Sequence, residues 1–339
     1  MSSTPSGGRE FSAAQGGELT LPDECREALR RNSLIVAHLD PNGTMTPVGG
    51  GFAIGGTARG FIGMTACHVF AELVRREGSP HLRHGVFAQQ LEDIPHAPAL
   101  DEGRFRAFFA VPSGWVHGAI RWCVTSRDLD IAVFFCEHSE GWGSYMMAIP
   151  ISIDIPPVGS RVIISTLRDI SIGRNDRGKR LVQAIPADLW GGVISHKSRG
   201  VFNKGPCMEL SLPSDLQMSG SAVVRAPVSP GPRFLDDLVV CGMICSSSYF
   251  DATKPVWSEN AECLVTTFAP LLFPALALNL PGGIPIQGQQ RTEWDLMSLA
   301  EFDLIRLVGD LGAIARVRLP DGQCIVTSRK WDALNVRIE

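Results

Sequence analysis

GGGFAI at residues 49–54 and GFIGMTACHVF at residues 60–70 are the two stretches that decide the expected fold. Each begins with glycine and continues in apolar residues of strand length, and the Gly55-Gly56 pair between them favours a turn. The two stretches are therefore predicted to form a β-hairpin. Over residues 65–76 the apolar residues recur at helical spacing, which predicts a short helix and places His68 where the second strand ends.

Apolar runs of similar length continue on both sides of this hairpin. Many short runs, together with 35 glycines and 23 prolines, are typical of strands joined by turns and disfavour long helices. The runs form two series joined by residues 137–157, which predicts a mainly β protein with two strand-rich halves. The predicted strands are residues 33–38, 49–54, 60–64, 104–110, 115–124 and 130–136, then 161–167, 181–195, 207–212, 221–225, 238–245 and 263–268.

The two ends of the chain differ in composition from these halves. The first 20 residues are polar and rich in Ser and Gly, without the apolar core of a secretory signal, and are predicted to form a disordered leader. Near the C-terminus, the capping-box pattern Ser298-Leu-Ala-Glu301, an amphipathic pattern through Val308 and the turn signal Pro320-Asp-Gly322 predict a helix followed by a hairpin. The expected divisions are a leader (1–20), two halves (21–145 and 146–280), a linker (281–291) and a C-terminal appendage (292–339).

The composition excludes several functional classes. A net charge of −4 argues against a general nucleic-acid-binding protein, which usually carries a basic face. The longest apolar run, residues 268–280, contains two prolines and is shorter than the roughly 20 residues that span a membrane. The nine cysteines lack metal-ligand spacing, and the glycine-rich segment 49–56 lacks the Lys-Ser/Thr ending of a phosphate-binding loop. We therefore expect a cytoplasmic protein with buried, reduced thiols, no metal or other cofactor, and no nucleic-acid or membrane partner.

Three short segments indicate an enzyme only when they are taken together. They are MTACHV around His68, DLDIAV around Asp130 and QMSGSAV around Ser219. A histidine after a strand, an aspartate before an apolar strand and a Ser-Gly pair are each common in proteins without catalytic roles. Their order of His, Asp and Ser across two strand-rich halves is that of chymotrypsin-like triads and differs from the orders in subtilisin and the α/β-hydrolases.

The same segments resemble the motifs of the trypsin/chymotrypsin family of serine peptidases, most closely its intracellular bacterial branch. Residues 65–68 (TACH) resemble the family's T-A-A-H motif, and residues 130–133 (DIAV) resemble its D-I-A-L motif. Residues 218–221 (MSGS) resemble its nucleophile motif, and residues 240–244 (VCGMI) resemble a strand that borders the substrate. The resemblance extends over residues 30–280.

This resemblance implies a chymotrypsin-like fold, with two six-stranded antiparallel β-barrels and the C-terminal helix and hairpin as an appendage. His68 and Asp130 would come from the first barrel and Ser219 from the second, so the active site would lie between the barrels. The implied activity is that of a serine endopeptidase, which acts on protein or peptide substrates without a cofactor.

Each residue of the expected triad has a distinct chemical role. The Ser219 hydroxyl would attack the peptide carbonyl while His68 removes its proton, and Asp130 would orient the imidazole and stabilise its charged form. Ser221 and Asp128 are rivals for two of these roles. Ser219 is favoured because a nucleophile at Ser221 would lose the Ser-Gly-small pattern, and Asp130 is favoured because Asp128 lies outside the strand register.

The segment before Ser219 departs from the family pattern. The family's glycine, whose amide forms the oxyanion hole with the amide of the nucleophile, is replaced by Gln217, so the expected oxyanion hole is formed by Gln217 and Ser219. Met218 replaces an aspartate that pairs with a new N-terminus in secreted members, so activation by a regulatory protein partner is expected instead of activation by cleavage. By resemblance, the substrate pocket would involve Pro213, Ser214, Cys245, Ser246 and Ser247.

Two other functional classes remain open at this stage. The change at Gln217 also fits a catalytically silent trypsin-like module that binds proteins as a scaffold. In a third reading the barrels are purely structural and the C-terminal appendage carries the function, as a cap, a regulator site or an oligomer contact. The charged segment Gly173-Arg-Asn-Asp-Arg-Gly-Lys-Arg180 is predicted to be a solvated loop, with partner binding as the alternative.

Overall fold

The structure is a computed structural model in which most of the two barrels and part of the appendage are described. The predicted leader 1–20 lies outside the described residues. The described residues are 21–57, 59–70, 104–126, 129–138, 145–174, 178, 180–197, 206–213, 218–226, 237–247, 262–272, 285–286, 289–290, 295–318, 324–328 and 337–338.

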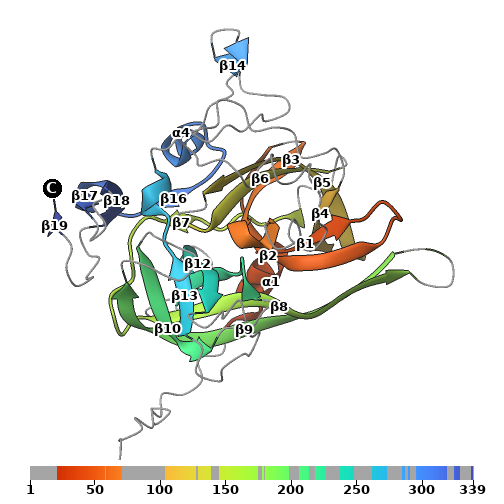
Figure 1. Ribbon diagram of the computed structural model, residues 1–339, viewed down its shortest axis with the longest axis horizontal. Coiled ribbons are helices and arrows are strands. Elements are labelled where there is room, and N and C mark those ends of the chain that lie inside the picture. The colour runs from red at the N-terminus through yellow and green to blue at the C-terminus, as the bar shows by residue number, and fades with distance from the viewer. Residues whose placement is uncertain are drawn as a thin grey trace, which may run out of the picture.

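The first half of the chain forms a closed six-stranded barrel (Figure 1). The strands follow each other around the barrel in the order β1-β2-β3-β6-β5-β4, and every neighbouring pair is antiparallel. The strands are β1 (Ser33–Leu39), β2 (Met45–Thr57), β3 (Gly60–Ala66), β4 (Phe105–Val111), β5 (Gly114–Ser126) and β6 (Ile131–Glu137).

The second half repeats this arrangement. Its six antiparallel strands pair in the order β8-β9-β10-β13-β12-β11, and the pairing of β11 with β8 closes the ring. Numbered from the start of each half, both barrels therefore have the same order, 1-2-3-6-5-4. The strands are β8 (Arg161–Arg174), β9 (Arg180–Lys197), β10 (Cys207–Pro213), β11 (Ala222–Arg225), β12 (Val239–Ser247) and β13 (Glu262–Thr266).

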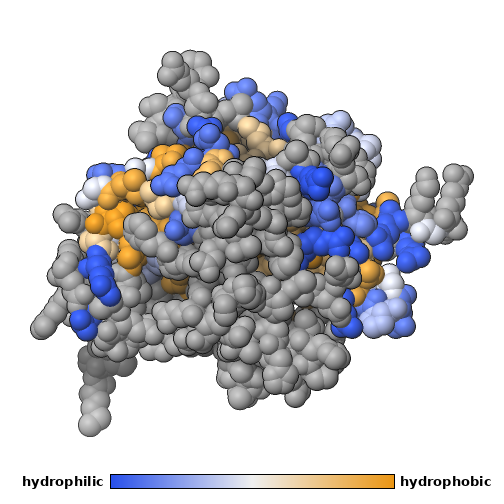
Figure 2. Space-filling model, turned by 90° about the horizontal axis from the view of Figure 1, so that it is seen from above, coloured by the Kyte–Doolittle hydropathy of each residue, from blue (hydrophilic) through white to orange (hydrophobic). Residues whose placement is uncertain are grey.

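The β8–β9 hairpin is longer than the barrel that it helps to form. Its distal part extends over the outer surface of the first barrel (Figure 1), where Ile170 and Val182 pack against Ile35, Ala37 and neighbouring apolar residues. The inner residues of β1 face the barrel core, so both faces of β1 are buried. In Figure 2, hydrophilic residues gather on the right-hand side, where the first barrel and the end of this hairpin lie in Figure 1.

The appendage attaches to both barrels. It contains α4 (Leu296–Glu301), β16 (Leu307–Val308) and the predicted hairpin of β17 (Ile314–Arg318) and β18 (Cys324–Ser328), and β19 (Arg337–Ile338) pairs with β17. β16 pairs in parallel with β7 (Ile151–Ser152), which itself pairs with β12 of the second barrel. Just before β16, Ile305 forms a bridge to Gly55 in β2 of the first barrel. Two short strands, β14 (Pro285–Ile286) and β15 (Gln289–Gln290), precede α4.

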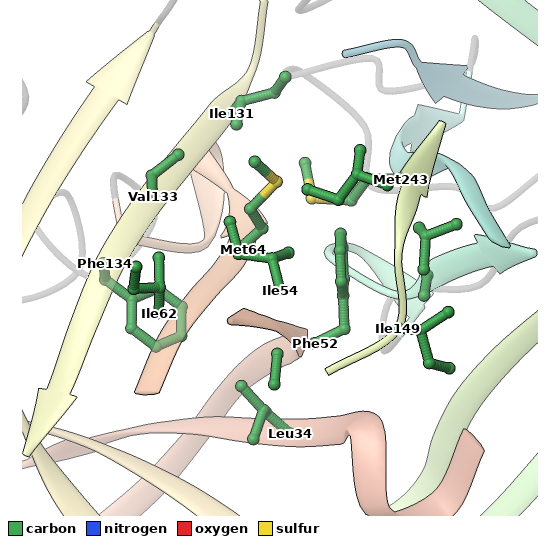
Figure 3. Close-up of a cluster of buried hydrophobic side chains, with 14 of the residues drawn as sticks. Leu34, Phe52, Ile54, Ile62, Met64, Ile131, Val133, Phe134, Ile149 and Met243 are labelled. Atoms are coloured by element: carbon green, nitrogen blue, oxygen red, sulfur yellow. The ribbon is translucent and has the colours of Figure 1, made fainter. Parts of the chain in front are cut away.

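The largest apolar core continues from one barrel into the other. Figure 3 shows Met243 of β12 beside Phe52 and Met64 of the first barrel, and Ile149, between the barrels, belongs to the same cluster. Burial of such side chains contributes roughly 1.5–3 kcal/mol each. This shared core holds the two barrels together.

The structure confirms the predicted fold class and corrects several local features. Gly55 and Gly56 lie within β2 and pair with Ile62 and Phe61, so the turn of the first hairpin falls after Thr57. α1 (Asp23–Asn32) was not predicted: it buries Leu29 against the first barrel, and its acidic first turn and basic last turn suit the helix dipole. The short helix after β3 is described as far as residue 70.

The helix of the appendage is also shorter than predicted. Its N-cap is Asp295, which forms a capping box with Ser298, so Ser298 is the third helical residue and not the cap. The helix ends at Glu301 because Asp303 adopts a left-handed conformation, with φ of 57°, which starts the turn toward β16.

We predict that Gly55→Ala loosens the appendage. A Cβ atom at this position would lie 1.9 Å from the Leu304 carbonyl oxygen, so either β2 or the appendage would have to move. Overpacking of this kind costs about 2 kcal/mol. The midpoint of thermal unfolding should fall, and proteolysis between the barrels and the appendage should accelerate. Gly56→Ala is the matched control, since its nearest contact would be 3.3 Å from the Gly60 carbonyl oxygen; equal effects of both substitutions would contradict the prediction.

Eight cysteines are described with their side chains; all eight are buried, and none of these eight forms a disulfide. The prediction of buried, unlinked thiols is therefore confirmed for these eight residues. Separately, none of the helices formed by the described residues is long and apolar enough to cross a membrane.

Candidate active site

His68 and Asp130 are joined by two hydrogen bonds. The imidazole Nδ1 lies 2.8 Å from Asp130 Oδ2, and the backbone N–H of His68 donates to Asp130 Oδ1 over 3.0 Å. The N–H of Cys67 also donates to the Asp130 carbonyl, at 3.1 Å. Three contacts thus tie the end of β3 to the turn before β6. The Asp130 carboxylate orients the imidazole so that Nδ1 faces Asp130 and Nε2 faces away from it.

Asp130 is almost completely buried, whereas His68 remains accessible. Their side chains are 3% and 27% exposed, respectively. Asp130 has φ of 53°, in the left-handed region where Asp is one of the few tolerated residues besides Gly. The preceding Leu129 carbonyl accepts a hydrogen bond of 3.0 Å from Thr266 Oγ1, at the end of β13. The second barrel therefore helps to hold the aspartate of the first.

Ser219 lies in a tight turn of the second barrel. The Ser221 N–H donates to the Met218 carbonyl over 2.9 Å, and Gly220, the third residue of the turn, has φ of 85°. A positive φ at this position is that of a type II turn and strongly favours glycine. The Gly220 N–H donates to the Ile244 carbonyl in β12, so the turn is fixed to the barrel wall. Met218 is buried in the core of the second barrel.

The turn also contacts the first barrel. The N–H of Gly50 in β2 donates to the Ser219 carbonyl over 3.0 Å, and the Gly50 carbonyl accepts a bond of 2.6 Å from Thr65 Oγ1. Thr65 is three residues before His68 in the same strand end. These bonds set the backbone of Ser219 against the strands that carry the His68–Asp130 pair.

Ser221, the rival nucleophile, has a different environment. It is buried, and its hydroxyl donates to Thr166 Oγ1 in β8 over 2.9 Å. Ser219 is partly exposed. Because an attacking hydroxyl must reach the substrate, the contacts of Ser221 suit a structural role, and Ser219 is the better candidate.

Several predicted site residues are only partly placed. Cys245 is fully buried, and its thiol donates to the Leu264 carbonyl at the pairing of β12 with β13. Pro213 ends β10, and Ser246 and Ser247 end β12. Gln217, Ser214 and the rival Asp128 lie outside the described residues. The assignments of the pocket and oxyanion hole therefore stay predictions.

Sequence reasoning missed three threonines that support this site, of which Thr266 bonds across the two barrels. Thr65, Thr166 and Thr266 are buried, and each uses its hydroxyl in a hydrogen bond with another segment. Threonines within β-prone runs are common, so their spacing carries no signal for this role. Among the described residues, no group of three or more His, Cys, Asp or Glu side chains could hold a metal ion.

The arrangement defines a chymotrypsin-like protein. Two six-stranded barrels share one strand order, the first carries a His-Asp pair, and the second presents a serine turn at their junction. This is the architecture that the resemblance to the trypsin/chymotrypsin family implies.

The solved structures that are similar to this chain include two proteases. The MamO protease domain from Magnetospirillum magneticum has 15% sequence identity and a TM-score of 0.39, and the match covers 71% of this chain and 94% of that one. Neuropsin, a serine protease expressed in the limbic system of mouse brain, has 11% identity and a TM-score of 0.42, and the match covers 71% of this chain and 91% of that one. No protein-family model and no curated protein matches the sequence.

Proposed function

We propose that the protein is a serine endopeptidase with His68, Asp130 and Ser219 as its catalytic triad. The observation that carries this proposal is the bond between His68 Nδ1 and the buried carboxylate of Asp130. A carboxylate at Nδ1 favours the tautomer in which Nε2 can accept a proton from a serine. Ser219, in a turn attached to the same strands, is the candidate donor of that proton.

The proposed reaction proceeds through an acyl-enzyme. Ser219 Oγ attacks the peptide carbonyl as His68 takes its proton, and the protonated imidazole then gives this proton to the leaving amine. Water, activated by the same histidine, releases the acyl group. The backbone amides of Gln217 and Ser219 are the proposed donors to the oxyanion, and a protein partner that completes this oxyanion hole would activate the enzyme. We place this activity in the cytoplasm, where free thiols stay reduced.

Labelling with a fluorophosphonate tests the proposal directly. We predict a single covalent adduct by intact mass spectrometry on the native chain and none on Ser219→Ala. Ser221→Ala is the control and should keep the adduct, because Ser221 is buried and bonded to Thr166. An adduct that persists in Ser219→Ala would refute the assignment. An unlabelled native chain that binds proteins would favour the silent scaffold.

A further inference from the structure

The outer part of the β8–β9 hairpin presents a free strand edge. Within the described chain, β10 pairs with β9 only from Val193 to Lys197, so residues 180–190 are hydrogen-bonded to β8 alone. Pro186 lacks an N–H group and interrupts this edge, which leaves residues 180–185 as a continuous stretch that can pair with another strand.

The side chains along this stretch alternate between two environments. Val182 and Ala184 pack toward the first barrel, while Leu181 and Ile185 point outward and are 51% and 58% exposed. Apolar side chains exposed on a strand with a free edge suit an added strand, whose own side chains would lie beside them.

Basic side chains lie around the end of the same hairpin. Arg180 Nη1 donates to His117 Nε2 in β5 over 2.7 Å, and Arg174, opposite Arg180 in the hairpin register, donates to the Gly43 carbonyl over 3.3 Å. Arg106, on the outer surface of β4, is close enough to lower the pKa of His117 together with Arg180. None of the described acidic side chains forms a salt bridge with Arg106, Arg174 or Arg180.

The placement of the hairpin brings the free edge of β9 close to Arg106 and Arg180. β8 lies against β1 and β2, whereas β9 reaches His117 on β5, so the free edge of β9 faces the side of the first barrel that carries Arg106. We infer that the free edge of β9 at residues 180–185, with Arg106 and Arg180, binds an extended acidic peptide segment of another protein. Backbone bonds would hold the segment, and its carboxylates would pair with the arginines.

The pKa of His117 is expected to change when this site is occupied. Burial, followed by the nearby Arg180 and Arg106, lowers the pKa of His117 to about 4. The only other described charged groups of β5 and β6 that face this surface are Arg121 and Glu137, which pair with each other over 2.8 Å. Bound carboxylates would offset the two arginines, so occupancy of the site should raise the pKa of His117.

The site also lies within reach of the candidate nucleophile. Thr166, where the outer part of β8 begins, accepts a hydrogen bond from Ser221, and strand geometry puts Arg174 about 26 Å further along. The segment 180–185 lies opposite residues 168–174 of β8, so if the proposed function holds, a substrate anchored at the hairpin would be cleaved within about eight residues of its acidic segment. This extension rests on the proposed function, whereas binding of the segment does not.

Binding is tested with the full chain carrying Ser219→Ala, so that no hydrolysis is needed. The probe is a fluorescein-labelled (Glu-Val)4 peptide followed by fluorescence anisotropy at low salt. We expect saturable binding that weakens about tenfold in Arg106→Gln/Arg180→Gln and is largely kept in Arg180→Lys. Arg306→Gln, which removes one positive charge from the exposed appendage, should have no effect.

A second readout separates local binding from general attraction. The NMR titration of His117 should shift to higher pH on addition of (Glu-Val)4 and stay unchanged with (Gln-Val)4. Absence of binding, equal binding of (Gln-Val)4, or equal weakening by Arg306→Gln would overturn the inference, and so would binding only to anionic lipid vesicles. A chain that binds the peptide but resists fluorophosphonate would support this site while refuting the proposed function.

Discussion

Asp130→Asn is expected to lower kcat/KM for peptide hydrolysis about 10⁴-fold. The carboxylate accepts from both the ring and the backbone of His68, and it is almost completely buried. An amide at this position can present its NH2 group to Nδ1, which favours the tautomer whose Nε2 carries the hydrogen. The imidazole can then no longer accept the proton of Ser219. The rate of acylation by an activated ester, measured in single turnovers, checks the expected loss.

Asp303→Asn is the matched control for this substitution. Asp303 shares the left-handed conformation of Asp130, with φ of 57°, but lies in the appendage after α4. It should keep full activity. Thermal unfolding of Asp130→Asn should show that the barrels stay folded, since the asparagine retains hydrogen-bonding capacity. A loss of less than tenfold in a folded protein would mean that Asp130 does not serve the triad.

Gly220→Ala is expected to have the second-largest effect, a loss of about 10²-fold in kcat/KM. A Cβ atom at this position would lie 2.3 Å from the Gly50 carbonyl oxygen and 2.5 Å from Thr65 Oγ1. Both neighbours belong to the first barrel and already contact each other, so neither can withdraw without moving its strand. The turn must therefore shift, and Ser219 shifts with it. Steady-state kinetics and fluorophosphonate labelling rates measure the loss.

Gly159→Ala isolates the cost of backbone conformation. Gly159 has φ of 89°, close to that of Gly220, but a Cβ atom there would meet nothing within 4 Å. The left-handed backbone alone costs an alanine about 1–2 kcal/mol of stability at either site. Only Gly220→Ala should also lose activity. If both variants were equally active, the contact of the serine turn with Gly50 would not position the nucleophile.

The candidate site depends on bonds that cross between the barrels. Gly50 of the first barrel bonds to Ser219 of the second, and Thr266 of the second bonds to Leu129, next to Asp130 of the first. The candidate nucleophile and its candidate partners are thus positioned relative to each other by backbone and threonine groups. A substrate or regulator that changes the barrel contact would alter this geometry without touching the triad.

Local sequence was sufficient to predict most strands, and it supplied the candidate site residues. Apolar runs of strand length lie within β1, β4, β5 and β6 nearly to their ends, because a strand buried on at least one face needs such residues wherever it lies. We could choose His68, Asp130 and Ser219 as site candidates from the sequence because each belongs to a short motif at a strand end. Residues in such motifs keep their local conformation, so their spacing along the chain carries information.

Local sequence failed where a distant segment set the conformation. Gly55-Gly56 has the composition of a turn, yet it lies in β2, because the Leu304–Ile305 segment packs so close that a side chain at Gly55 would collide with it. The first strand of the hairpin was expected to end at residue 167, but β8 continues to Arg174 where the hairpin packs on the outside of β1, whereas β9 lies close to its predicted range. No sequence pattern within either segment indicates which distant segment packs against it.

The sequence by itself determined that this chain is mainly β, in two halves, with a histidine, an aspartate and a serine in the order of a chymotrypsin-like triad. Periodicity and short motifs are properties of neighbouring residues, so they can be read without the fold. Only the tertiary structure decided that both barrels close with the same strand order, that His68 meets Asp130, and that Gly50 holds the Ser219 turn. These contacts join residues far apart in the chain, and the energy that selects them comes from burial and hydrogen bonding between segments that exist only in the folded protein.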